Sequence, residues 1–169
     1  MDAAAQLRQD FASAHGFLEG TLGDVSNADA TAPGPGATHS IAANYAHVLF
    51  GEDGVVNGMV AGGAPLFATT FAGKTGASEP PPQGPMWGEW AKSATFDIAK
   101  LRVYGQAVYA ATDAYLASAK EADLARMLDM PGDQYSVSRF LGVIVGNAWM
   151  HCGEISCLKG VRGQAGYPM

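Results

Sequence analysis

Apolar residues recur at intervals of three and four along four long stretches of the chain, which is the spacing of one face of an amphipathic helix. The first stretch, about residues 3–22, carries this face as Leu7, Phe11, Ala14 and Leu18. The second begins after Thr38 or Ser40, either of which suits a helix N-cap, and ends at the Gly-Gly-Ala-Pro run of residues 62–65. Both stretches predict helices of several turns.

Two further helices are predicted in the second half of the chain. The third covers about residues 90–119 and is the longest, and the fourth runs from a cap at Ser136 to about residue 160. No stretch alternates with a period of two between hairpin turns, so no sheet is predicted. We therefore predict an all-α, up-and-down four-helix bundle, formed by residues 1–169 as a single domain.

Residues 62–88 form a long connection between the second and third helices, rich in glycine and proline. Its length allows a crossover, and an irregular segment of this size in a compact domain is usually functional or mobile. We expect it to lie over one end of the bundle and to supply a pocket wall. Within it, residues 68–75 are similar to a phosphate-binding loop, but Ala68 replaces the first glycine and no strand precedes it, which argues against nucleotide binding.

Composition and charge exclude several classes of protein. Hydrophobic residues make up 48% of the chain and charged residues 15%, which is typical of a compact globular protein. The formal charge of −6 argues against a surface that follows phosphates, so nucleic acid is not an expected partner. The first eight residues lack the basic and apolar regions of a secretory signal, and no apolar run is long enough for a bilayer. We expect a cytoplasmic protein without a membrane-spanning segment.

The two cysteines, Cys152 and Cys157, lie five residues apart on the fourth predicted helix. At ~100° per residue their side chains point about 140° apart, so they cannot bridge each other. Two unbridged thiols fit a reducing compartment, and we expect each to be a small buried hydrophobe.

The fourth helix also carries the most informative polar pattern. One continuous face has residues at alternating intervals of four and three positions: Phe140, Ile144, Asn147, His151, Glu154 and Leu158. The apolar members should face the bundle interior, so Asn147 and His151 should do so too, one turn apart. Side chains of facing helices build metal sites in bundle interiors, and His47 on the second helix is the best third donor. The spacing leaves two interpretations open: a metal site of these three residues, or a hydrogen-bonded polar cluster that fixes helix register.

The remaining histidines have no such spacing. His39 precedes His47 by two helical turns, about 12 Å along an axis at ~1.5 Å per residue, and is interpreted as a surface or cap residue. His15 has no partner at a helical interval and is interpreted as structural or solvated. Trp87, Trp90 and Trp149 are interpreted as packing residues.

Three runs of residues resemble the DinB/YfiT-like metalloenzymes over nearly the whole chain. They are His47-Val48-Leu49-Phe50-Gly51-Glu52, then Asn147-Ala148-Trp149-Met150-His151-Cys152-Gly153-Glu154-Ile155, and Leu158-Lys159-Gly160-Val161-Arg162-Gly163. The resemblance implies a four-helix bundle, often dimeric, whose divalent metal keeps open positions for water. It also implies metal ligation by one histidine of the second helix and an H-x-x-x-H pair of the fourth.

Carried over residue by residue, the metal ligands are His47, His151 and Asn147, and Asn147 departs from the family pattern because it stands where the first histidine of the pair belongs. An amide oxygen is a poor donor for zinc or nickel, the metals that this resemblance favours. Glu154 and Glu52 are the nearest further ligands by spacing. Glu154 is also the candidate for a base or for a group that orients a ligand histidine.

The resemblance implies a metal-dependent enzyme that acts on a small molecule, of the hydrolase or thiol S-transferase type, and a homodimer formed through an apolar helix face. The alternative is a non-catalytic bundle with a degenerate metal site, which serves as a ligand-binding or oligomeric interaction module. The two hypotheses differ in whether the site with Asn147 in place of a histidine still binds a metal.

Overall fold

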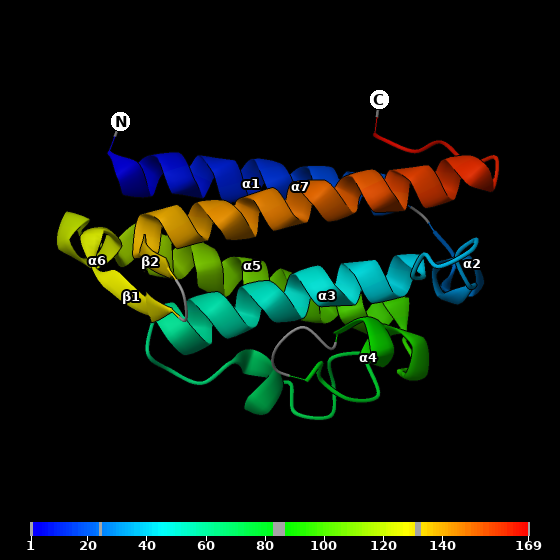
Figure 1. Cartoon of the computed structure of the whole chain (residues 1–169), viewed down its shortest axis with the longest axis horizontal. Helices are drawn as coiled ribbons and strands as arrows, with labels where there is room; N and C mark the ends of the chain where they lie inside the picture. Colours follow the sequence, from blue (N-terminus) through cyan, green and yellow to red (C-terminus); the bar gives the residue numbers. More distant parts are fainter. Residues whose placement is uncertain (1, 24, 83–86, 131–132, 169) are drawn as a thin grey trace.

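Four long helices lie side by side in the computed structural model, which describes residues 2–23, 25–82, 87–130 and 133–168 (Figure 1). They are α1 (Ala3–Leu22), α3 (Ile41–Asp53), α5 (Ile98–Ser118) and α7 (Val137–Val161). Each of α1 and α3 packs against both α5 and α7. The predicted all-α four-helix bundle is confirmed, and the first predicted helix has the observed bounds.

The two middle helices of the bundle, α3 and α5, run parallel to each other and antiparallel to α1 and α7 (Figure 1). Strict up-and-down alternation is therefore absent, because α5 begins at the same end of the bundle as α3. The part of the connection of residues 62–88 that the structure describes runs along the side of α3 rather than over one end of the bundle, so that expectation was wrong. The crossover that its length allows is present.

Side-chain caps define where the long helices begin. Of the two caps that the sequence left open for the second helix, Ser40 is the one used, and the predicted cap at Ser136 is present; each hydroxyl accepts a hydrogen bond from a backbone N–H three residues later. Asp2 and Asp97 cap α1 and α5 in the same way. Each of these oxygens satisfies a backbone donor that the first turn of a helix leaves unpaired.

The third predicted helix is wrong as a single element. The chain forms a short α4 (Trp87–Ser93), leaves the helix, and starts again at α5. Between them Phe96 pairs with Ala77 in an isolated antiparallel bridge, and the Asp97 amide donates to the Gly76 carbonyl at 2.7 Å. These bonds to the distant connection replace the helical bonds that local periodicity favours.

The start of the connection is anchored by a buried carboxylate. After α3 the chain widens into a π-helix (Gly54–Val60) and then forms a 3-10 turn (Leu66–Ala68). Asp53, which is fully buried, accepts hydrogen bonds from the backbone N–H groups of Leu66 and Phe67 and from the Tyr104 hydroxyl. The anchor explains how an irregular segment can hold a fixed position on the bundle.

Besides the 3-10 turn, four short elements in the described part of the chain were not predicted. They are α2 (Asn27–Thr31), α6 (Glu121–Ala125), β1 (Met127–Met130) and β2 (Asp133–Ser136), and the two strands pair antiparallel. Strands of four residues are too short to show an alternation in sequence, so the prediction of no sheet was wrong here.

The end of α7 ties two other helices to the bundle. The Lys159 ammonium, which is buried, donates to the Thr21 carbonyl in the last turn of α1. The Arg162 guanidinium donates to the Asp29 and Ala32 carbonyls at the end of α2. Cations are favourable at helix C-termini, because carbonyls there lack intrahelical partners.

The two cysteines are free, as expected, but their surroundings differ. Cys152 is buried against Thr21, whereas Cys157 is exposed, so the interpretation of Cys157 as a buried hydrophobe was wrong. Across the described part of the chain, no helix combines the length and the apolar character that a bilayer crossing requires.

Candidate functional site

His47 of α3 and His151 of α7 meet inside the bundle, as the sequence pattern predicted. Their ring centroids lie 4.9 Å apart and their planes are inclined by 69°. The antiparallel contact of the two helices brings together residues that are more than 100 positions apart in the chain. This pair, together with the groups that surround it, is the candidate site.

Two acceptors fix the orientation of the His151 ring. The ring nitrogen Nδ1 lies 2.7 Å from Oε2 of Glu154 and 3.2 Å from Oδ1 of Asn44. Both partner atoms are acceptors, because the Asn44 amide nitrogen donates to the Ser40 carbonyl. Nδ1 therefore carries a proton, and Nε2 is the nitrogen of His151 that is left for other contacts. Glu154 thus orients the His151 ring, and its role towards a metal ligand or as a base stays a prediction.

The environment of His47 favours its neutral form. Burial, followed by the proximity of His151 and of His39, lowers the pKa of the His47 imidazole from 6.5 to about 4. At neutral pH the imidazole thus carries no charge and offers one lone pair.

This pKa shift predicts a pH dependence of stability. The unfolded chain takes up a proton at His47 near pH 6.5, but the folded chain does so only near pH 4. The contribution of neutral His47 to the free energy of unfolding is therefore complete above pH 6.5 and decreases as the pH falls from 6.5 to 4. We expect His47→Gln to flatten the stability profile in this window, measured by urea unfolding at pH 4 to 8. An unchanged slope in the variant would show that other groups cause the dependence.

Trp87, the first described residue after position 82, lies among three histidines. Its indole stacks on His47 with a centroid distance of 4.2 Å and a plane angle of 26°, and it also contacts His39 at 4.5 Å and the edge of His151 at 5.8 Å. The interpretation of Trp87 as a packing residue therefore missed a member of the site. His39 precedes the N-cap of α3, so helical spacing does not apply to it, and its ring lies beside the site rather than on the surface.

A cavity of about 430 Å³ opens next to this cluster, and we call it the Trp87 cavity. Apolar atoms form most of its wall, while Asn44 and Glu154, the two groups that orient His151, supply polar atoms. The complete lining is Pro35, Ala37, Thr38, His39, Asn44, Trp87, Glu154, Cys157, Leu158 and Val161. Its size is within the range of small-molecule pockets.

Comparison with known proteins identifies the family. The sequence model of the DinB superfamily matches residues 3–155, which is most of the chain. The chain belongs to the DinB superfamily. A crystal structure described as the conserved protein of locus from Enterococcus faecalis matches with a TM-score of 0.75 and 22% identity, over 97% of this chain and 99% of that one. At this identity the likeness shows the shared fold. No curated protein matches the chain.

The donor atoms present do not fit the three-histidine metal centre that the DinB resemblance implies. Across the described residues, no group of three or more His, Cys, Asp or Glu side chains is placed to hold one metal ion. His47 and His151 supply two imidazoles, the Glu154 carboxylate contacts the far nitrogen of His151, and Asn147 is a half-buried amide. Zinc sites in proteins use at least three side-chain ligands. The metal site of His47, His151 and Asn147 stays a prediction.

Glu52, the other carboxylate that spacing suggested as a ligand, lies elsewhere in the DinB bundle. It is buried between α1 and α5, where it contacts His15 and Thr112. Glu52 is five residues after His47, so on a helix the two side chains point about 140° apart. The helical register alone thus separates it from the site.

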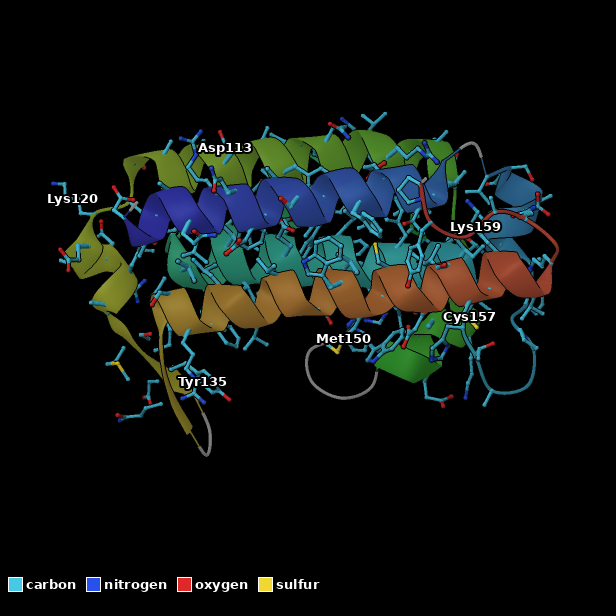
Figure 2. The ribbon with its side chains drawn as sticks, turned by 90° about the horizontal axis from the view of Figure 1, so that it is seen from above. Asp113, Lys120, Tyr135, Met150, Cys157 and Lys159 are labelled. Carbon is cyan, nitrogen blue, oxygen red and sulfur yellow. The ribbon has the colours of Figure 1, made fainter. Side chains whose placement is uncertain are left out.

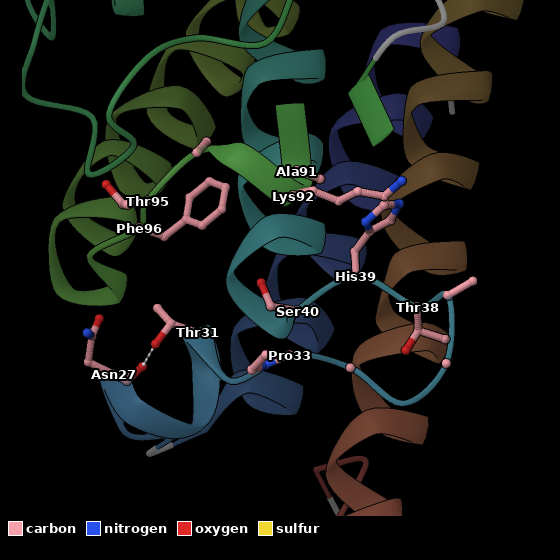
Figure 3. A pocket seen from close by; sticks show the side chains of 14 residues that line it. Asn27, Thr31, Pro33, Thr38, His39, Ser40, Ala91, Lys92, Thr95 and Phe96 are labelled. Atoms are coloured by element: carbon pink, nitrogen blue, oxygen red, sulfur yellow. Dashed lines mark hydrogen bonds between the residues drawn. The ribbon is translucent and has the colours of Figure 1, made fainter. Parts of the chain in front are cut away.

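A second, larger cavity of about 560 Å³ lies beyond the His39 segment, between the start of α3 and the junction of α4 with α5 (Figure 3). Its polar lining is largely committed to local structure. The Thr31 hydroxyl donates to the Asn27 carbonyl, the Ser40 hydroxyl caps α3, and the Lys92 ammonium pairs with Glu89. We therefore place the candidate site of this DinB-superfamily chain at the Trp87 cavity.

Proposed function

We propose that this DinB-superfamily chain binds a small organic molecule in the Trp87 cavity and needs no metal to do so. One observation carries the proposal: a largely apolar cavity of about 430 Å³ ends at the polar groups that orient His151. Binding sites for small molecules combine an apolar wall with a few placed polar atoms in this way. This is the ligand-binding alternative to a metal-dependent enzyme.

The lining of the cavity indicates the chemistry of the ligand. Trp87, Leu158 and Val161 offer carbon surface, which suits an apolar body. The carboxylate of Glu154 is half exposed at the cavity, and its Oε1 atom accepts no hydrogen bond from any residue that the structure describes. A carboxylate accepts charge-assisted hydrogen bonds from ammonium groups. The ligand class that fits is therefore a small amine with an apolar body.

The exposed thiol of Cys157 provides a test, since it lines the same cavity. We expect methyl methanethiosulfonate to modify Cys157 alone, because burial raises the pKa of the Cys152 thiol. In EDTA-treated protein, 2-phenylethylamine should bind before modification and at least ten-fold more weakly after it, measured by NMR titration. The same treatment of Cys157→Ser should leave binding unchanged. Failure of the untreated protein to bind the amine, or equal binding after modification, would refute the proposal.

A metal-dependent enzyme of the hydrolase or thiol S-transferase type is the second candidate. It is favoured by the contact between Glu154 and Nδ1 of His151, because a carboxylate on the far nitrogen is how proteins orient a ligand imidazole. Elemental analysis of untagged protein beside His47→Ala and His151→Ala tests it. Near-stoichiometric zinc or nickel that both variants lose would favour the enzyme over the metal-independent binding protein.

We also propose that the chain forms a homodimer through α7. Val143 and Met150 are exposed and seven residues apart, so they lie on one line of the helix, and Figure 2 shows Met150 on the side of α7 that faces away from α1. Gly146 lies between them and leaves room for a second helix to approach closely. A two-fold contact of α7 with its copy would cover these apolar side chains.

Met150→Glu should convert this dimer to a monomer, because two carboxylates would then face each other across the two-fold axis. The measurement is the mass in solution by light scattering at several concentrations, with Met127→Glu on β1 as the control for an exposed methionine outside α7. A parent protein that is monomeric at high concentration would contradict the proposal.

A further inference from the structure

A second polar cluster lies inside the bundle between α1, α3 and α5, away from the Trp87 cavity. His15, interpreted from sequence as structural or solvated, forms a buried pair with Glu52, and the distance from Nε2 to Oε2 is 2.8 Å. The other oxygen of Glu52 accepts a hydrogen bond from the Thr112 hydroxyl at 2.6 Å. The His15 ring stacks on Tyr109 with a centroid distance of 3.8 Å. The histidine is thus fixed in position and orientation.

The hydrogen bonds of Glu52 determine where the His15 ring carries a proton. A carboxylate only accepts, so Nε2 of His15 is the donor. Nδ1 of the same ring contacts no partner among residues 2–23, 25–82, 87–130 and 133–168, although His15 is only 9% exposed. Among the described residues no fully buried side-chain nitrogen or oxygen lacks a partner, so this nitrogen is accessible to solvent, and a ligand atom can take the place of water there.

A cavity of about 300 Å³ borders His15 between α1 and α5, and we call it the His15 cavity. Its wall is apolar at Phe11, Ala12, Ala110 and Leu116. At its rim Arg8 of α1 pairs with Asp113 of α5 through two hydrogen bonds of 2.8 and 2.9 Å, and Figure 2 shows Asp113 beside α1. Asp113 occupies Nε and Nη2 of the guanidinium, which leaves Nη1 for another acceptor.

We propose that the His15 cavity binds a small monocarboxylic acid with a short apolar tail. A carboxyl group suits the free nitrogen whether His15 is neutral or charged, since the acid donates to a lone pair and the carboxylate accepts from an N–H. Arg8 offers the second oxygen a charge-assisted donor at the rim. The tail would lie against Phe11 and Leu116. The site uses no metal and none of the residues of the Trp87 cavity.

The other charges near the cavity support a ligand of at most one negative charge. Glu52 already accepts hydrogen bonds from His15 and Thr112, and Asp113 pairs with Arg8. The Glu19 carboxylate accepts from the hydroxyls of Tyr45 and Tyr109, whose pKa values burial raises, so both hydroxyls stay donors. A dicarboxylate would place an unpaired charge against the apolar wall.

Hexanoate is the probe, and 1-hexanol is its match without a carboxyl group. The test is an NMR titration of the full chain with ¹⁵N-labelled histidine, which reports on each ring nitrogen separately. We expect hexanoate to shift the Nδ1 resonance of His15 in a saturable manner without shifting His47, and 1-hexanol to leave both unchanged. Replacing His15 would remove the partner of the buried Glu52, so the test variant keeps His15. It is Ala110→Leu, in which a larger side chain on the exposed wall fills the cavity.

Ala110→Leu should weaken hexanoate binding at least ten-fold. Ala114→Leu is the matched control, because Ala114 is also exposed on α5 and does not line the cavity. No saturable shift of His15, equal binding by the two variants, or a response confined to His47 would each overturn the proposal. These outcomes leave the amine titration of the Trp87 cavity unaffected, so the two sites are tested separately.

Discussion

Asn147→His is expected to give a protein that retains close to one zinc or nickel ion per chain after purification without a tag. The substitution places a third imidazole one helical turn before His151, whose Nδ1 proton already directs Nε2 away from Glu154. Three imidazoles meet the ligand number of a catalytic zinc site, whereas two do not. We expect the metal affinity to rise by at least ~100-fold over the parent, measured by competition with a chromogenic chelator.

The matched control is Asn147→Gln, which keeps an amide at this position and should leave the metal content at the level of the parent. Two results would contradict our account of the site. Stoichiometric metal in the parent would mean that two imidazoles and an amide suffice. A folded Asn147→His protein without metal would mean that the number of donors is not what limits binding.

The largest loss of stability is expected for His15→Leu. The substitution removes the cationic or N–H partner of Glu52, whose side chain is fully buried, and leaves a carboxylate oxygen without a donor. Breaking a buried pair in this way costs about 3–5 kcal/mol in the free energy of unfolding. Urea unfolding at pH 7, followed by circular dichroism, measures the change.

The double substitution His15→Leu with Glu52→Leu separates the charge effect from loss of packing. Replacing both members of a buried pair by apolar residues of similar volume is often neutral, so the double variant should regain most of the lost stability. The Thr112 hydroxyl can then donate to a carbonyl of its own helix. A single variant that loses less than about 1 kcal/mol, or a double variant that loses more than the single one, would show that the pair does not carry this energy.

Sequence patterns predicted those parts of the fold that depend on local periodicity. α1 was found with its observed bounds because its apolar face is regular. The break between α4 and α5 was missed because bonds from residues 96 and 97 to the distant connection cause it. Tertiary contacts of this kind override helical propensity and leave no local signal.

The candidate site was predicted in part for the same reason. His47 and His151 were found, since a polar residue in an apolar seam must face its partner helix. Trp87 was missed because it reaches the histidines from the crossover connection, and His39 because it lies before its helix begins. The pairing of His15 with Glu52 joins two different helices, so the intervals along one helix could not reveal it.

The side-by-side packing of α1 and α7 has a consequence for how the chain folds. Phe17 and Thr21 of α1 contact Trp149 and Lys159 of α7, so a main seam of the bundle joins segments about 130 residues apart. Contacts of such long sequence separation form late, because the entropy of closing the loop is lost before they stabilise the chain. During translation the part of α1 that packs against α7 stays uncovered until α7 leaves the ribosome, and until then it is a surface to which chaperones can bind.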